Sequence, residues 1–179
     1  VGASGDTITI PSGATIVNSG TQTGFGGANT PAFEAYLSST QSGVADATSV
    51  KVQFDTVVLD TDSDYDNTTN YRFTPTTAGK YYIYFVFLGA VAGVSRLSQI
   101  AGGIYKNGSV SLETAIDNRS DGYGLSSALT LTTIIDMNGS SDYLECFGYV
   151  NDNDGGTVNF YGTSAGGRCA FGGYKIIGT

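Results

Sequence analysis

The stretch that decides the fold is GKYYIYFVFLG, residues 79–89. In an extended strand alternate side chains point to opposite faces, so Tyr81 shares one face with every second residue to Phe87, and Tyr82 shares the other with every second residue to Leu88. Both sets are apolar or aromatic. A strand with water on one side alternates apolar with polar residues. This stretch therefore predicts a strand that fills the core with one face and packs on a second partner with the other.

The composition predicts a single main all-β domain. The chain has 179 residues, of which 26 are Gly, 12 Tyr and 9 Phe, and only 13% are charged. Such a chain is long enough to bury a sizeable core and is typical of short strands joined by tight turns. Eight to ten short strands recur after residue 30, and the nearest helix candidate, PAFEAYLSSTQ at residues 31–41, reads equally well as a first strand. A sandwich or jelly roll is the expected architecture.

Residues 1–30 differ from the rest and are predicted to form a separate N-terminal segment, with the main domain at residues 31–179. The segment reads as strand, turn and strand, followed by a Gly/Ser/Thr/Asn stretch suited to a linker. Two short strands bury too little surface to fold alone. The segment is therefore either the end of a fibre shaft that borrows neighbouring strands or a loose N-terminal extension.

Charge and hydropathy exclude two classes of partner. The formal net charge is -8, and the eight Lys and Arg are scattered singly. This pattern predicts no nucleic-acid partner, because nothing would track a phosphate backbone. There is also no run of 18 apolar residues, so membrane insertion is not expected. The two cysteines, Cys146 and Cys169, are predicted to be free buried thiols, with one bridge as the alternative.

The sequence favours a non-catalytic protein. It contains no His, which excludes a Ser-His-Asp or Cys-His site within the chain. A carboxylate pair alone can hydrolyse glycosides. However, only three Glu occur, and the Asp residues cluster in turns, where burial is not expected to raise a carboxyl pKa.

Two acidic stretches carry the oxygen ligands that calcium prefers: DTDSDYDN at residues 60–67 and NDNDGG at residues 151–156. Neither completes a twelve-residue EF-hand loop. Asp152 and Asp154 are the tentative calcium ligands. Ordinary turn formation explains the same residue types equally well.

Beyond these patterns, the sequence resembles the C1q/TNF-like superfamily. The family signature is a Phe followed at set spacings by Asn/Asp, an aromatic residue, a Phe and Gly-x-Tyr-x-Phe-x-aromatic. The matching residues are Phe54, Asp60, Tyr65, Phe73, Gly79, Tyr81 and Phe85. One extra residue separates Tyr65 from Phe73, and Ile83 stands where the family prefers Phe. YKNG at residues 105–108 is similar to the family's Lys-Asn-Gly turn, and CAFGGYKII at residues 169–177 is similar to its closing strand.

This resemblance covers residues 31–179 and implies a ten-stranded jelly roll that assembles as a homotrimer. In C1q-like domains the strand similar to residues 80–88 lies in the sheet whose outer face packs on neighbouring subunits. Tyr82, Tyr84 and Val86 are therefore the expected trimer-interface residues. Several C1q-like trimers bind calcium near their axis, which adds some support to the acidic site.

In this jelly roll the first and last strands are neighbours, so both termini are expected at one end. The free end then carries loops at residues 89–103, 117–126 and 151–168, whose tyrosine, amide and charged side chains suit contact with a host-surface protein or glycan. Solvated loops without a ligand are the alternative. The tentative ligand-binding residues are Arg96, Asn118, Arg119, Asp121, Tyr123 and Tyr161.

The leading functional hypothesis is the non-catalytic trimeric head of a viral fibre, with a bacteriophage as the expected source. Such a head would lie on the virion, outside the cell, and attach it to a host. The hypothesis depends on GDTITIPSGATIV at residues 5–17, which resembles β-structured repeats of phage fibres, and on the lack of a collagen-like tract. The alternative is a structural trimerisation domain of a virion or bacterial surface appendage that binds no ligand. A secreted animal signalling protein is the third hypothesis.

Overall fold

The computed structural model describes residues 29–92, 96–118, 124–165 and 167–177, together with residues 5, 7, 9–15, 17 and 19. These residues contain thirteen strands and no helix, and hence no helix able to span a membrane. The strands are β1 (Ala32–Tyr36), β2 (Gln41–Val44), β3 (Val50–Lys51), β4 (Thr56–Asp60), β5 (Tyr65–Asp66), β6 (Arg72–Phe73), β7 (Gly79–Val91), β8 (Leu97–Lys106), β9 (Ser109–Asp117), β10 (Ser126–Met137), β11 (Leu144–Asp152), β12 (Val158–Phe160) and β13 (Ala170–Lys175).

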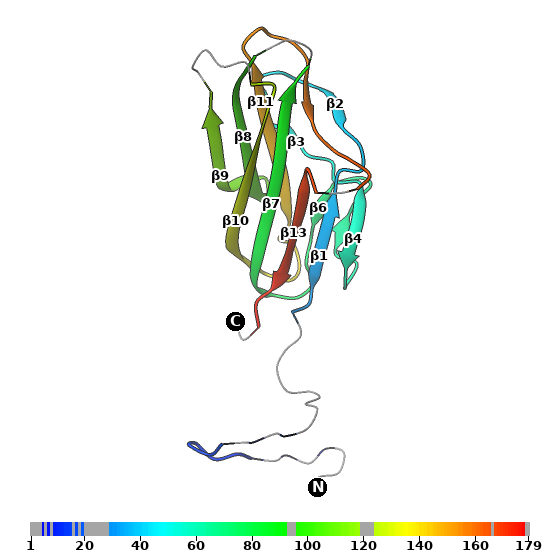
Figure 1. The fold of residues 1–179 in the computed structure, drawn as a ribbon. Helices are drawn as coiled ribbons and strands as arrows, with labels where there is room; N and C mark the ends of the chain where they lie inside the picture. Colours follow the sequence, from blue (N-terminus) through cyan, green and yellow to red (C-terminus); the bar gives the residue numbers. More distant parts are fainter. Residues whose placement is uncertain are drawn as a thin grey trace.

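The strands form two antiparallel sheets packed face to face (Figure 1). One sheet has seven strands in the order β2-β12-β7-β13-β1-β4, with β10 paired along the other edge of β7. The other has six strands in the order β5-β6-β11-β8-β9, with β3 paired to β11. The predicted all-β sandwich is confirmed. Five of its segments are only two to four residues long, as expected of short strands broken by turns.

β7 is paired on both edges, with β10 on one and β12 and β13 on the other, and its side chains divide as the alternation predicts. Tyr81, Ile83, Phe85 and Phe87 are all 0% exposed and belong to the core between the sheets. On the opposite face, Tyr82 and the alternate residues that follow it are half-buried. The core therefore explains one face of this strand and leaves the other without a covering layer in the single chain.

The residues that carry the family resemblance build this core and the turns that lead into it. Phe54 meets Phe85 edge to face, with ring centroids 6.0 Å apart. The Asp60 carboxylate accepts the backbone N–H groups of Asp64, at 3.1 Å, and Tyr65, at 3.0 Å. The same turn thereby delivers the buried Tyr65 ring to the core. The spacing of the signature thus reflects a capped turn between two core aromatic residues.

The β8–β9 hairpin confirms the predicted Lys-Asn-Gly turn. Asn107 and Gly108 have φ values of 53° and 78° and form the two-residue connection between the strands. Positive φ at both positions is the requirement of a type I′ turn, which matches the twist of the flanking strands. At one end of the sandwich, Ala32 of β1 pairs with Tyr174 of β13. The two ends of the main domain therefore lie together, as expected (Figure 1).

Both cysteines are free and buried, which confirms the predicted thiols. Cys146 lies in the core on β11, and burial raises the pKa of its thiol well above the ordinary value. Cys169 precedes β13, and its Sγ accepts the backbone N–H of Leu88 at 3.2 Å. Burial raises the pKa of this thiol to about 11. Both sulfurs therefore act as small hydrophobic groups in the interior.

Candidate functional site

The first candidate surface is the outer face of the seven-stranded sheet, which we call the β7 face. The register places Tyr82 between Ile134 of β10 and Tyr174 of β13. The exposed fractions of Ile134 and Tyr174 are 59% and 40%. The Tyr82 and Tyr174 rings lie 5.5 Å apart. The residues of the face are Tyr82, Tyr84, Val86, Ala128, Thr130, Thr132, Ile134, Ala170, Gly172 and Tyr174.

Tyr84 packs over its cross-strand neighbour Gly172 in the middle of the β7 face. A Cβ atom at Gly172 would come within 2.5 Å of Cζ and 2.8 Å of Cε1 of the tyrosine ring. The ring therefore occupies the space that any larger residue on β13 would take. Burial raises the pKa of the Tyr84 hydroxyl, and its hydrogen bond to Glu34 on β1 raises it further. The hydroxyl thus stays protonated as a donor to the carboxylate.

Within β7, β10 and β13, charged residues lie at only one end, whereas Glu34 of β1 follows Gly172 in the row of Tyr84 and accepts its hydroxyl hydrogen bond. The three charged residues of β7, β10 and β13 are Lys80, Asp136 and Lys175, all beside the chain termini. Lys80 Nζ lies 2.8 Å from Oδ1 of Asp136. Along β7, β10 and β13 the centre of the face is depleted of charge, as in the core of a protein–protein interface, and Glu34 of β1 borders it. Tyr82, Tyr84 and Val86 all lie on this outer face, and their role in a trimer interface stays a prediction; Leu88, which shares their side of β7, packs against the core cluster.

Two of the three predicted distal loops contain strand residues: β12 interrupts residues 151–168, whereas residues 117–126 do connect β9 to β10. β7 continues to Val91 and β8 begins at Leu97, so the expectation that residues 89–103 form a loop is wrong for most of that range. Close packing explains the small residues there. A Cβ at Gly89 would lie 2.5 Å from Val150, and one at Gly102 would lie 2.8 Å from Leu129. These glycines allow the two sheets to approach each other and do not mark a turn.

The structure brings only some of the proposed distal binding residues together. Arg96 Nη2 lies 3.3 Å from Oδ1 of Asp154, and Asn118 follows β9 at the same end, its N–H donating to Ser98 O at 2.7 Å. Tyr161 is held apart from this pair. Its backbone N–H donates a hydrogen bond to the Leu88 carbonyl, and its ring centroid lies 5.6 Å from the Arg168 guanidinium. Arg119, Asp121 and Tyr123 lie outside the described residues. A ligand site at this end stays a prediction.

The two tentative calcium ligands have other roles in the structure. The buried Asp152 carboxylate accepts the N–H groups of Asp154 at 3.0 Å and Gly156 at 2.9 Å, which closes the turn after β11. Asp154 pairs with Arg96. Within the described part of the chain no three His, Cys, Asp or Glu side chains are grouped so that they could hold a metal. The turn therefore accounts for the Asp152 carboxylate, and the ion pair with Arg96 accounts for that of Asp154.

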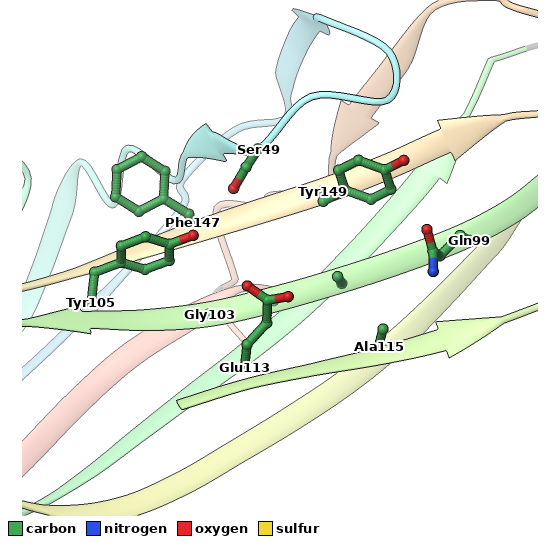
Figure 2. Close-up of a pocket in the computed structure, with 10 residues that line it drawn as sticks. Ser49, Gln99, Gly103, Tyr105, Glu113, Ala115, Phe147 and Tyr149 are labelled. Carbon is green, nitrogen blue, oxygen red and sulfur yellow. The ribbon is translucent and has the colours of Figure 1, made fainter. Parts of the chain in front are cut away.

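A second surface, which the sequence reasoning missed, is a groove on the outer face of the six-stranded sheet (Figure 2). This β8 groove has a volume of about 330 Å³ and is open to solvent on one side. It runs over β8, between side chains of β11 and β9. Its lining residues are Ser49, Gln99, Ala101, Gly102, Gly103, Tyr105, Glu113, Ala115, Phe147 and Tyr149. The sequence does carry a signal for it, because Phe147 and Tyr149 are aromatic on the side of β11 that faces away from the core.

Comparison with known proteins gives a likeness of fold. No family model matches the sequence, and no curated protein matches it either. Among solved structures, the globular domain of zebrafish complement 1qA protein aligns with a TM-score of 0.56 and 16% identity, over 82% of this chain and 97% of that one. Eiger TNF from S. frugiperda aligns with a TM-score of 0.56 and 11% identity, over 81% of this chain and 91% of that one.

Murine APRIL aligns equally well, with a TM-score of 0.56 and 11% identity, over 81% of this chain and 98% of that one. Two antiparallel sheets, the absence of helices from the described residues and these three alignments agree with one another. Identities this low establish the fold and nothing about activity. The chain therefore has the C1q/TNF-like jelly-roll fold.

Proposed function

We propose that this chain is a non-catalytic head domain that forms a homotrimer through the β7 face. The observation that carries the proposal is the β7 face itself. It is a central strip of tyrosine, isoleucine, valine and small residues on a sheet whose other side already fills the core. Closed threefold assembly covers such a strip in every copy and leaves no sheet face open for aggregation. The sequence resemblance to C1q-like domains supports the same arrangement.

The role of this head is attachment of a virion, through a fibre or appendage outside the cell, to a host-surface protein or glycan. Support comes from the placement of both ends of the main domain on one side, which leaves the opposite end free to meet a host (Figure 1). The repeat-like GDTITIPSGATIV segment supports a fibre, and its described residues are all exposed. The absence of His, and of a metal-binding group among the described residues, supports a binding role without catalysis.

Assembly is tested by measuring particle mass, using mass photometry and sedimentation. The wild-type domain is expected at three times the chain mass. Tyr82→Asp would place a charge in the centre of each interface and is expected to give monomers that keep the β-sheet circular dichroism spectrum. Val110→Asp is the matched control, since Val110 is 53% exposed on the other sheet. A folded wild-type monomer, or equal dissociation of both variants, would contradict assembly through the β7 face.

Attachment is tested separately by binding the fluorescently labelled trimer to a panel of intact bacterial cells. We expect retention on the cells of at least one strain, with no release of envelope sugars. Release of sugar fragments would identify a depolymerase and overturn the non-catalytic role. A trimer that bound no cell, while its deletion disrupted the parent fibre, would support the trimerisation-only alternative.

A further inference from the structure

We propose that the β8 groove binds a neutral pyranose sugar, such as a terminal hexose or N-acetylhexosamine of a glycan. This deepens the attachment role proposed above by naming a ligand class. It places the contact on the flank of the head, whereas the sequence had suggested the distal loops. The inference does not require the β7 face, because groove and face lie on opposite sheets of the same sandwich.

The strand register explains why the surface is hollow over β8. Phe147 of β11, Gly103 of β8 and Glu113 of β9 form one row across the sheet. The next row along the groove contains Tyr149, Ala101 and Ala115. Each row therefore runs from a large aromatic residue through a small residue on β8 to β9. Aromatic side chains form one wall, the floor is nearly bare backbone, and Glu113 forms part of the opposite wall (Figure 2).

Packing of the core does not require the small residues on the floor of the groove. Ala101 and Gly103 point away from the interior, whereas Gly102 between them faces the core side chains Leu129 and Phe85. Glycine in the middle of a strand is destabilising relative to alanine. What Gly103 provides is space, since a Cβ there would come within 2.7 Å of Cε2 of Tyr105. The Tyr105 ring can therefore lie across the end of the groove.

The aromatic end of the groove is held in place by its neighbours. The Tyr105 and Phe147 rings lie 4.4 Å apart, centroid to centroid, at an interplanar angle of 44°. Lys51 Nζ lies 5.8 Å from the Phe147 ring centroid and forms an ion pair with the buried Glu145 carboxylate. Rings that are packed before the ligand arrives lose little conformational entropy on binding.

The chemistry of the lining fits a pyranose ring. Such a ring has an apolar C–H face and an edge of hydroxyl groups. Tyr105, Phe147 and Tyr149 offer aromatic surface for the first. Glu113 and Gln99 offer a carboxylate and an amide for the second, and hydrogen bonds to a charged group are stronger than neutral ones. A small-molecule site usually spans about 300–1,000 Å³. The 330 Å³ of this groove therefore suits one or two sugar rings.

The charge of the groove selects against acidic ligands. Glu113 is the one charged residue in the lining, and the whole chain carries a formal net charge of -8. Sialic acids, uronic acids and nucleotides would bring a second negative charge next to this carboxylate. A neutral sugar has no such penalty, and it can donate hydroxyl hydrogens to Glu113.

The test uses the whole chain and two kinds of measurement. A glycan array that contains neutral, sialylated and uronic-acid-terminated oligosaccharides identifies the class. Saturation-transfer NMR with the corresponding free monosaccharide then gives the affinity of one site without avidity. We expect binding to neutral glycans only. Tyr149→Ala is expected to weaken the per-site affinity at least tenfold, and Glu113→Gln roughly tenfold, with particle mass unchanged.

Tyr174→Ala is the matched control, because it removes an exposed tyrosine from the β7 face on the other sheet. It is expected to change the particle mass and leave the per-site affinity unchanged. If the wild-type chain is monomeric yet binds sugar through Tyr149, the trimer proposal fails and this one stands. If no array sugar binds, if only acidic glycans bind, or if binding is unaffected by Tyr149→Ala and Glu113→Gln, the groove proposal is overturned.

Discussion

The Gly172→Ala substitution probes the β7 face with a single methyl group. Gly172 is buried beneath the Tyr84 ring, and the added Cβ would come within 2.5 Å of Cζ of that ring. The backbone of Gly172 does not adopt the left-handed conformation that favours glycine. Alanine therefore strains the strand little, and the tyrosine must move. Tyr84 would leave its position on the β7 face and its hydrogen bond to Glu34.

The size of the effect follows from the displaced ring. A side chain forced off its preferred rotamer costs about 0.5–1.5 kcal/mol. If the ring relaxes in the free subunit but is held off its preferred rotamer against a neighbour, this cost arises three times in a closed trimer and weakens assembly by roughly 1.5–4.5 kcal/mol. Because each 1.4 kcal/mol is about a tenfold change in an equilibrium constant, assembly should weaken roughly 10- to 1000-fold. The stability of the isolated fold should change less, because alanine suits a strand interior better than glycine and offsets part of the lost hydrogen bond between Tyr84 and Glu34.

The assay is mass photometry over a dilution series, with thermal unfolding followed by circular dichroism on the same samples. Gly124→Ala is the control, because a Cβ there would meet no atom within 4 Å. The Gly172 variant should dissociate at higher concentrations than the wild type, and the control should not. Identical dissociation curves for wild type, variant and control would refute the placement of Tyr84 in the interface.

Two further predictions concern stability and the thiols. Asp66→Ala should lower the free energy of unfolding at neutral pH by about 1–2 kcal/mol, because the carboxylate accepts the backbone N–H groups of residues 68–70. These bonds hold the pKa of Asp66 below its ordinary value of 3.8, so their contribution is complete above that pH and is lost as the pH falls towards the lower folded-state pKa. Urea unfolding at several pH values should show the wild-type advantage shrinking below about pH 4, and a constant difference would contradict this assignment. Cys146 and Cys169 should resist alkylation in the native protein and react fully in denaturant without reductant; a thiol that stays unlabelled there would reveal a bridge.

The sequence predicted best those features that depend on local periodicity. The division of β7 into a core face and an outer face follows from the two-residue period of a strand, and Tyr81 and Tyr82 lie on the sides that this period assigns. The Asn107–Gly108 turn could also be predicted from the sequence, because few residue types adopt positive φ at two adjacent positions. Local rules fail for residues 89–103, where small residues allow tight packing between the sheets and do not mark a loop.

The β8 groove could not be derived from the sequence, because it depends on the register between three strands. Nothing local to Phe147 shows that Gly103 lies beside it, or that Glu113 follows in the same row. The argument that singled out β7 does apply to β11, whose Tyr149 is aromatic on the side away from the core. Aromatic residues on both faces of a predicted strand therefore indicate a second contact. They do not show whether that contact is a subunit or a ligand.

The two proposals assign assembly and recognition to opposite sheets of the sandwich. If the β7 face is closed within a trimer, the β8 groove stays on the outside of each subunit, and three copies face the solvent around one axis. A shallow site for one or two sugar rings binds weakly alone, but three sites raise the apparent affinity for a glycan-coated surface through effective concentration. Substitutions on the two sheets should then have different effects on binding. Loss of Tyr149 should reduce binding to a free sugar and to cells alike, whereas displacement of Tyr84 should reduce binding to cells only.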